Sequence, residues 1–99
     1  MDIEKLLQIM KHYGPRCQLI KTMEELSELQ VELARHLNHI GSMESITNEL
    51  ADVHIMLSQI QAMLFIDQDD LESRIAFKID RQLKRIQEEE TQPDDCPWR

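Results

Sequence analysis

The sequence contains little of what stabilises small disulfide-rich or β-rich domains. It has 2 cysteines, 2 glycines and 3 prolines in 99 residues, and aromatic residues make up only 4% of the chain. Cys17 and Cys96 lie far apart and lack the spacing of metal ligands, which excludes a disulfide framework and a cysteine metal site. We therefore expect a reducing compartment, and the scarcity of aromatic residues argues against a β-sandwich.

Long apolar runs and an excess of positive charge are also missing. The longest wholly apolar run covers residues 62–66, far short of the roughly 20 residues that span a bilayer, and no basic-then-apolar leader follows Met1. Acidic residues number 19 against 11 Lys and Arg, a net charge of −8, whereas a nucleic-acid-binding protein needs a cationic face. We expect a cytoplasmic protein that binds neither membranes nor nucleic acids.

What the sequence does contain is long stretches of helix-forming residues with few interruptions. Before residue 90, glycine and proline occur only at residues 14–15 and at Gly41. The pattern predicts helices over residues 2–12, 16–40, 43–64 and 69–90, with Ser42 and Asp67 as N-caps. A chain of this length carries one core, so residues 1–90 are interpreted as a single all-α domain and residues 91–99 as a polar C-terminal tail.

The second and third predicted helices each carry an apolar stripe at helical spacing. The two stripes consist of Leu19, Met23, Leu26, Leu33, Leu37 and Ile40, and of Ile46, Leu50, Val53, Leu57, Ile60 and Leu64. Joined at residues 41–42, they predict an antiparallel helical hairpin. Further apolar residues flank both stripes, so we expect a four-helix bundle completed by the C-terminal helix and by oligomerisation, as a homodimer or homotetramer.

Glu49 is an acidic residue at a position that should be apolar. Its neighbours on a helical wheel are Ile46, Leu50 and Val53, and Asp52 borders the same stripe. Most helical glutamates simply lie on a solvated face. Burying two like charges without a partner is costly, however, so this helix predicts a bound cation.

The second predicted helix supplies more carboxylates rather than a cation. In an antiparallel hairpin, Glu25 and Glu28 can face Glu49 and Asp52 across the interface. Oxygen ligands without His or Cys favour Mg²⁺, with Mn²⁺ as a substitute. A di-iron site would need Glu-x-x-His pairs, which the sequence lacks.

The acidic residues form two motifs. The chain reads EELSE at residues 24–28 and, after 20 further residues, ELAD at residues 49–52. This pair resembles the EExxE and ExxD signature of the all-α nucleoside triphosphate pyrophosphohydrolases, the MazG-like superfamily. The flanking residues resemble it too, so that the similarity covers roughly residues 12–86.

The resemblance implies Mg²⁺-dependent hydrolysis of a nucleoside triphosphate between the α and β phosphates, for example to remove non-canonical or excess deoxynucleotides. The products would be a nucleoside monophosphate and pyrophosphate. By motif position, it implies that Glu25, Glu28, Glu49 and Asp52 hold metal ions. It also implies that Glu24 and Glu25 take part in catalysis, Glu24 by holding a further ion or by orienting the attacking water.

Basic residues that could bind the triphosphate lie on the fourth predicted helix. Arg74, Lys78, Arg81 and Arg85 are spaced 4, 3 and 4 residues apart, so they share one strip. The resemblance assigns phosphate binding first to Lys78 and Arg81, with Arg85 and Lys21 as further candidates. The alternative is a solvated strip paired with nearby acidic residues, and Lys21 could instead bridge a carboxylate.

The sequence does not indicate which base the substrate carries. Tyr13 and Gln18 are candidates for the pocket that binds it.

Three alternatives to a general pyrophosphohydrolase stay open. The chain could be a narrow-specificity relative that acts on dUTP, dCTP or phosphoribosyl-ATP, or a non-catalytic helical oligomerisation or interaction module. It could also be a metal-dependent regulatory or nucleotide-binding protein without turnover.

Overall fold

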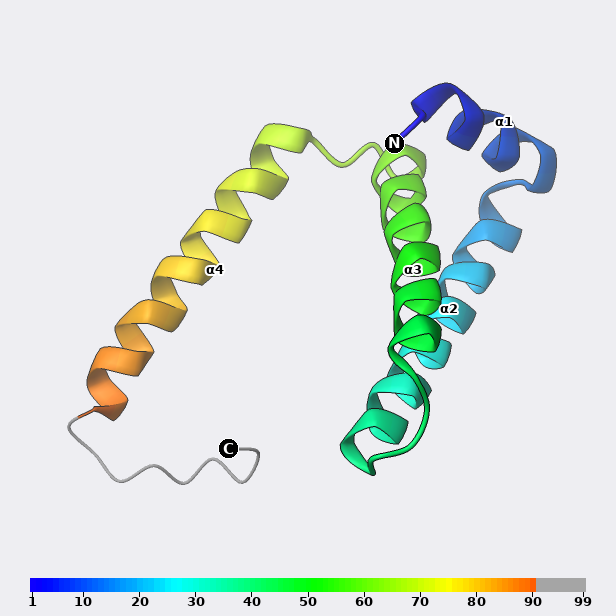
Figure 1. Ribbon diagram of the computed structural model, residues 1–99. Helices are drawn as coiled ribbons and strands as arrows, with labels where there is room; N and C mark the ends of the chain where they lie inside the picture. Colours follow the sequence, from blue (N-terminus) through cyan, green and yellow to red (C-terminus); the bar gives the residue numbers. More distant parts are fainter. Residues whose placement is uncertain (91–99) are drawn as a thin grey trace. The chain divides into compact units, whose positions relative to one another are not determined.

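The computed structural model describes residues 1–90 of the chain. These residues form α1 (Ile3–Tyr13), α2 (Pro15–Leu37), α3 (Met43–Met63) and α4 (Gln68–Glu89), and they contain no strand (Figure 1). The all-α prediction is confirmed, and each predicted helix end lies within three residues of the observed one. The predicted tail at residues 91–99 lies outside the described residues.

Local chemistry explains where the helices begin. Both predicted N-caps are confirmed: Ser42 and Asp67 accept hydrogen bonds from backbone N–H groups in the first turns of α3 and α4, at 3.1 and 2.9 Å. Gly14, which separates α1 from α2, has a φ of +86°, a conformation that glycine adopts far more readily than other residues. Pro15 then opens α2, where its missing N–H has no helical partner to lose.

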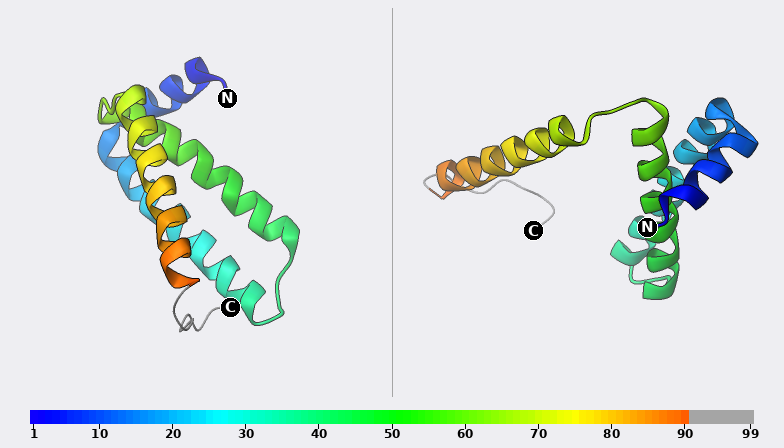
Figure 2. Two further views of the ribbon diagram at one scale, coloured as in Figure 1. Left: turned by 90° about the vertical axis from the view of Figure 1, so that its left-hand side faces the viewer. Right: turned by 90° about the horizontal axis from the view of Figure 1, so that it is seen from above.

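The chain divides into two compact units, Met1–Phe65 and Ile66–Arg99. In the first, α2 and α3 run side by side in opposite directions, which confirms the predicted hairpin (Figure 2). Helix α1 packs against both of them at the end where α2 begins and α3 ends (Figure 1). The buried apolar side chains of this unit are Leu6, Val53 and Met56, a small core for three helices.

The face of α2 that packs against α3 differs from the predicted one. Its buried side chains are Gln18, Thr22 and Glu25. In the predicted apolar stripe, by contrast, Met23 is 60% exposed and Leu37 is 77% exposed. The prediction that this stripe forms the hairpin interface is therefore wrong, and α2 turns a polar face toward its partner helix.

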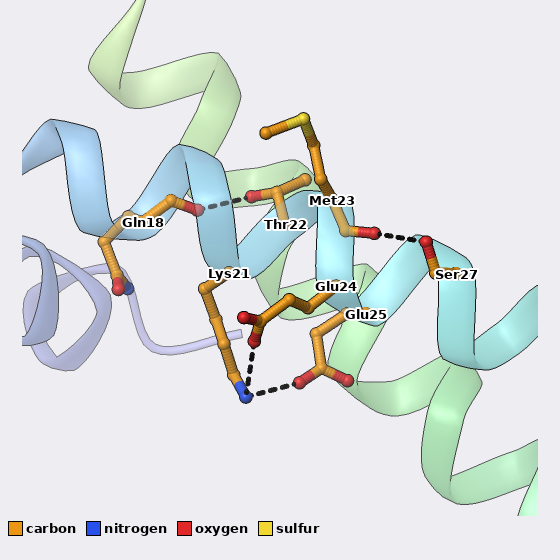
Figure 3. Close-up of polar contacts among 7 residues, drawn as sticks. All are labelled: Gln18, Lys21, Thr22, Met23, Glu24, Glu25 and Ser27. Carbon is orange, nitrogen blue, oxygen red and sulfur yellow. Dashed lines mark hydrogen bonds and ion pairs between the residues drawn. The ribbon is translucent and has the colours of Figure 1, made fainter.

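Hydrogen bonds explain why α2 can bury polar side chains. The Thr22 hydroxyl donates to the backbone carbonyl of Gln18 at 2.8 Å (Figure 3), and the Gln18 amide donates to Gln59 of α3 at 2.6 Å. A polar group that keeps a partner can be buried at modest cost. The stripe of α3 is predicted more successfully, because Val53 is buried, although Leu57 is half exposed.

Helix α4, described by itself, is amphipathic and has no buried residue. Four apolar side chains spaced along it are each about half exposed: Ile75, Ile79, Leu83 and Ile86. A helix of this kind gains little stability from its own sequence and depends on an apolar partner surface. None of the helices in residues 1–90 combines the length and the apolar character that crossing a membrane requires.

Candidate functional site

Three carboxylates meet where α2 packs against α3. Glu25 comes from α2, and Glu49 and Asp52 come from α3; one oxygen of each lies within 4.8 Å of the others. Glu25 is only 5% exposed, Glu49 is half-buried and Asp52 is exposed, so the cluster runs from the hairpin interface to the surface. The sequence predicts that these three residues lie together, and the structure brings them together.

Lys21 is the cation next to this cluster. Its Nζ lies 2.9 Å from Glu25 Oε1 and 3.7 Å from Glu24 Oε2, one turn along α2 (Figure 3). The hydrogen bond from Lys21 lowers the pKa of Glu25, and the same bond raises the pKa of Lys21. Lys21 therefore bridges carboxylates, one of the two roles that its position allowed.

One cation does not satisfy the cluster. Glu25 Oε2 and Glu49 Oε2 are both buried, and neither has a hydrogen-bond partner among residues 1–90. Burial raises the pKa of Glu49, and the negative charges of Glu28, Glu25 and Asp52 raise it further. Buried polar atoms in proteins are almost always paired, so two unpaired carboxylate oxygens indicate a missing positive partner.

The donor set fits a hard divalent cation. All three converging residues offer carboxylate oxygens, and the group contains neither His nor Cys. Such ligands suit Mg²⁺ or Mn²⁺ better than zinc or copper, which favour nitrogen and sulfur. A cation held by these carboxylates would supply a positive partner and would relieve the repulsion that raises the pKa of Glu49.

The remaining two acidic candidates flank the cluster. Glu28 lies outside the three-carboxylate group and instead lines, with Glu49 and Glu32, a neighbouring cavity of about 220 Å³. Glu24 is exposed, with its carboxylate turned toward Lys21 (Figure 3). Of the four predicted metal ligands, the structure therefore brings three together and places the fourth beside them.

A second cavity, of about 390 Å³, adjoins the cluster through Lys21. It lies within the first unit, and its walls are Ile9, Tyr13, Cys17, Gln18, Lys21 and Met56. Both base-pocket candidates, Tyr13 and Gln18, thus line one cavity together with the lysine that contacts Glu25. Cys17 is a free thiol, whereas Cys96 lies in the part of the chain that the structure does not describe.

Gln59 is a site residue that the sequence pattern did not predict. It is completely buried on α3, where its Oε1 accepts the hydrogen bond from Gln18. Glu49 was recognised as a polar residue on an apolar helix face. The same pattern could have identified Gln59, which also interrupts an apolar face, beside Met56 and Ile60. Burying an uncharged amide costs less than burying a charge, so a glutamine at such a position is weaker evidence for a site than a glutamate.

The basic candidates on α4 belong to the second unit. Lys78 and Arg81 line one cavity of about 410 Å³ on this helix, together with Arg74 and Asp70. Arg74 Nε is bonded to Asp70 at 3.0 Å, so at this position the structure shows a surface ion pair. Lys78, Arg81 and Arg85 are all exposed.

Comparison of the chain with protein-family models, with curated proteins and with solved structures gives no match. Function is therefore inferred from the chemistry of the residues themselves. The carboxylate cluster, Lys21 and the adjoining cavity are the features of the first unit that point to a ligand.

We expect Glu49→Gln to raise the melting temperature at neutral pH in the absence of divalent cations. A carboxyl group whose pKa is raised on folding binds more protons in the folded state, so its charge lowers stability as the pH rises above the ordinary value of 4.5. The gain should shrink below that pH, where both states are protonated. Thermal unfolding followed by circular dichroism across a pH series measures it, with Glu44→Gln in the exposed first turn of α3 as the control.

Added Mg²⁺ should raise the melting temperature of the wild-type protein and should raise that of Glu49→Gln much less, because a ligand that binds only the folded state stabilises it. If Mg²⁺ raised the melting temperature of both proteins equally, Glu49 would not be a ligand of the cation.

Proposed function

We propose that this protein is a Mg²⁺-dependent nucleoside triphosphate pyrophosphohydrolase that releases pyrophosphate and a nucleoside monophosphate. The observation that carries the proposal is the convergence of Glu25, Glu49 and Asp52, with two buried oxygens that have no partner. The EELSE and ELAD motifs support it, because the resemblance assigns metal binding to these same residues. A divalent cation held there would neutralise the triphosphate and polarise the α phosphorus.

A carboxylate of the chain itself would accept the proton of the attacking water. The water oxygen bonds to the α phosphorus while the bond from that phosphorus to the α–β bridging oxygen breaks, so pyrophosphate leaves and the water loses a proton. Glu25 is a weak base for this proton, because the hydrogen bond from Lys21 lowers its pKa. Glu24 is exposed beside it and lies farther from Lys21, at 3.7 Å, so we assign proton transfer to Glu24 and cation binding to Glu25.

Basic side chains would bind the phosphates. Lys21 lines the cavity next to the cluster, so its ammonium group is a positive charge within the proposed site. On α4, Lys78 and Arg81 line one cavity, and Arg85 follows one turn later on the same strip. The placement of these basic residues on one strip of α4 supports this part of the proposal.

Association of the chain with copies of itself is a further part of the proposal. Met23, Leu33 and Leu37 lie on one outward stripe of α2, and all are substantially exposed. Monomeric proteins seldom leave continuous apolar stripes in contact with water. A homodimer or homotetramer would cover this stripe.

Glu49→Gln and Asp52→Asn should each lower Mg²⁺-dependent pyrophosphate release by about 100-fold or more, because changes even to the partners of metal ligands cost 10–100-fold. Pyrophosphate release from a panel of ribonucleoside and deoxyribonucleoside triphosphates measures the effect, and circular dichroism confirms that helicity is retained. Glu44→Gln, on the same helix, should keep full activity. Undiminished turnover by Glu49→Gln would refute the metal-site assignment, whereas silence of the wild-type protein on every nucleotide would favour an interaction module.

Lys78→Ala should raise the KM for the nucleotide about tenfold with little change in melting temperature, because it removes a charge-assisted hydrogen bond to phosphate from an exposed side chain. Lys84→Ala, on the same helix but off the basic strip, provides the control for a general loss of positive charge. Unaltered kinetics combined with a lower melting temperature would make Lys78 a structural residue.

Leu33→Glu should convert the assembled protein to a monomer, because a buried unpaired carboxylate opposes association across the apolar stripe. Sedimentation velocity measures the change, with Asn48→Glu on the exposed side of α3 as a control of equal charge. A wild-type protein that sediments as a monomer would refute the assembly.

A further inference from the structure

Gln59 is an unusual choice for the interior of a helical hairpin. It is the largest side chain that is fully buried, with 0% exposure. Its Oε1 accepts a hydrogen bond of 2.6 Å from Gln18 Nε2, but its own Nε2 is buried and has no partner in the described part of the chain. A helix interface selected for stability alone would hold an apolar residue here, because an unpaired buried donor is costly.

The partner of Gln59 faces a cavity. Gln18 is 5% exposed, and it lines the cavity of about 390 Å³ between α1, α2 and α3. The other walls are mainly apolar, including Ile9 and Met56, and volumes of this order hold small organic ligands. A largely apolar pocket with one fixed amide is suited to a flat heterocycle with a polar edge.

The cavity also adjoins the proposed reaction centre. Lys21 forms part of its wall, and the same lysine places Nζ 2.9 Å from Glu25 Oε1. A nucleotide whose phosphates lie at the carboxylate cluster would therefore have this cavity within reach of its base.

The hydrogen bond to Gln59 determines which end of the Gln18 amide is available. Because Gln18 Nε2 donates to Gln59, and Gln59 Nε2 makes no hydrogen bond in return, the carbonyl Oε1 of Gln18 is left as an acceptor. If both amides were turned over, Gln18 would instead offer donors. The two orientations favour opposite base edges, since an acceptor binds an amino group and repels a carbonyl oxygen.

We propose, on the basis of the proposed pyrophosphohydrolase function, that this cavity binds the base of the substrate and that Gln18 Oε1 accepts a hydrogen bond from its exocyclic amino group. Gln59 is the positioning residue that holds the Gln18 amide in this orientation. The protein therefore prefers amino bases, cytosine and adenine, to their oxo counterparts, uracil and hypoxanthine. The members of each matched pair differ at the exocyclic group and at the ring nitrogen beside it. With Gln18 Oε1 placed against the exocyclic group, the oxo member leaves two buried acceptors opposed at that position.

Hydrolysis of the matched pairs CTP and UTP, and ATP and ITP, tests the proposal. The wild-type protein should favour the amino member of each pair by about tenfold or more in kcat/KM. Gln59→Met should abolish the preference by raising KM for CTP and ATP while kcat is kept. Gln59→Glu should retain the preference, because its carboxyl oxygen still accepts from Gln18 Nε2. Gln18→Met, nearer the cavity, should also lose the preference, and Gln87→Met, exposed on α4, should behave as the wild type.

Binding of nucleosides separates this proposal from the function on which it rests. Cytidine without Mg²⁺ should shift the side-chain amide NMR signals of Gln18 and Gln59, and uridine should shift them much less. If cytidine does so but no triphosphate is hydrolysed, the base pocket stands and the pyrophosphohydrolase function fails. If triphosphates are hydrolysed but Gln59→Met keeps the wild-type base preference, or if the oxo bases are preferred, the function stands and the role of Gln59 is refuted. Absence of both hydrolysis and cytidine binding refutes both.

Discussion

The approach of three carboxylates at the interface of α2 and α3 is the constraint on which the rest of the first unit depends. Glu25 is almost completely buried, and the hydrogen bond from Lys21 lowers its pKa and so favours its ionised form. Glu49, with a buried oxygen and no cation of its own, is left with a raised pKa. The hairpin thus carries an electrostatic cost that a divalent cation would offset, as expected where stability is sacrificed for a binding site.

This constraint accounts for the division of α2 into two faces. Turning Glu25 toward α3 also turns Thr22 and Gln18 inward, since these residues lie one and two turns before it, respectively. The apolar stripe must then face outward, where Met23 and Leu33 remain exposed. The inward face of α2 therefore carries the proposed site, and the outward face carries the apolar stripe. Neither face could turn the other way without rotation of the whole helix.

Lys21 and Gln18 connect the two parts of the proposed site. Lys21 contacts Glu25 on one side and lines the apolar cavity on the other, whereas Gln18 joins that cavity to the buried amide of Gln59. Phosphate chemistry and base recognition would therefore be supported by neighbouring turns of one helix. Substitutions in these turns should affect both, which is why matched nucleotides and separate kcat and KM values are needed to tell them apart.

The sequence by itself determined the four helices, the N-caps Ser42 and Asp67 of α3 and α4, and the pairing of Glu25 with Glu49 and Asp52. Helix formation and capping depend on residues a few positions apart, and an antiparallel hairpin of known turn position brings matching levels of its two helices together. Only the tertiary structure decided that the polar face of α2 packs inward, that Glu28 flanks the cluster, and that Gln59 holds Gln18. These features depend on the rotation of each helix about its own axis, which follows from the sum of all contacts between helices and not from the spacing within any one of them.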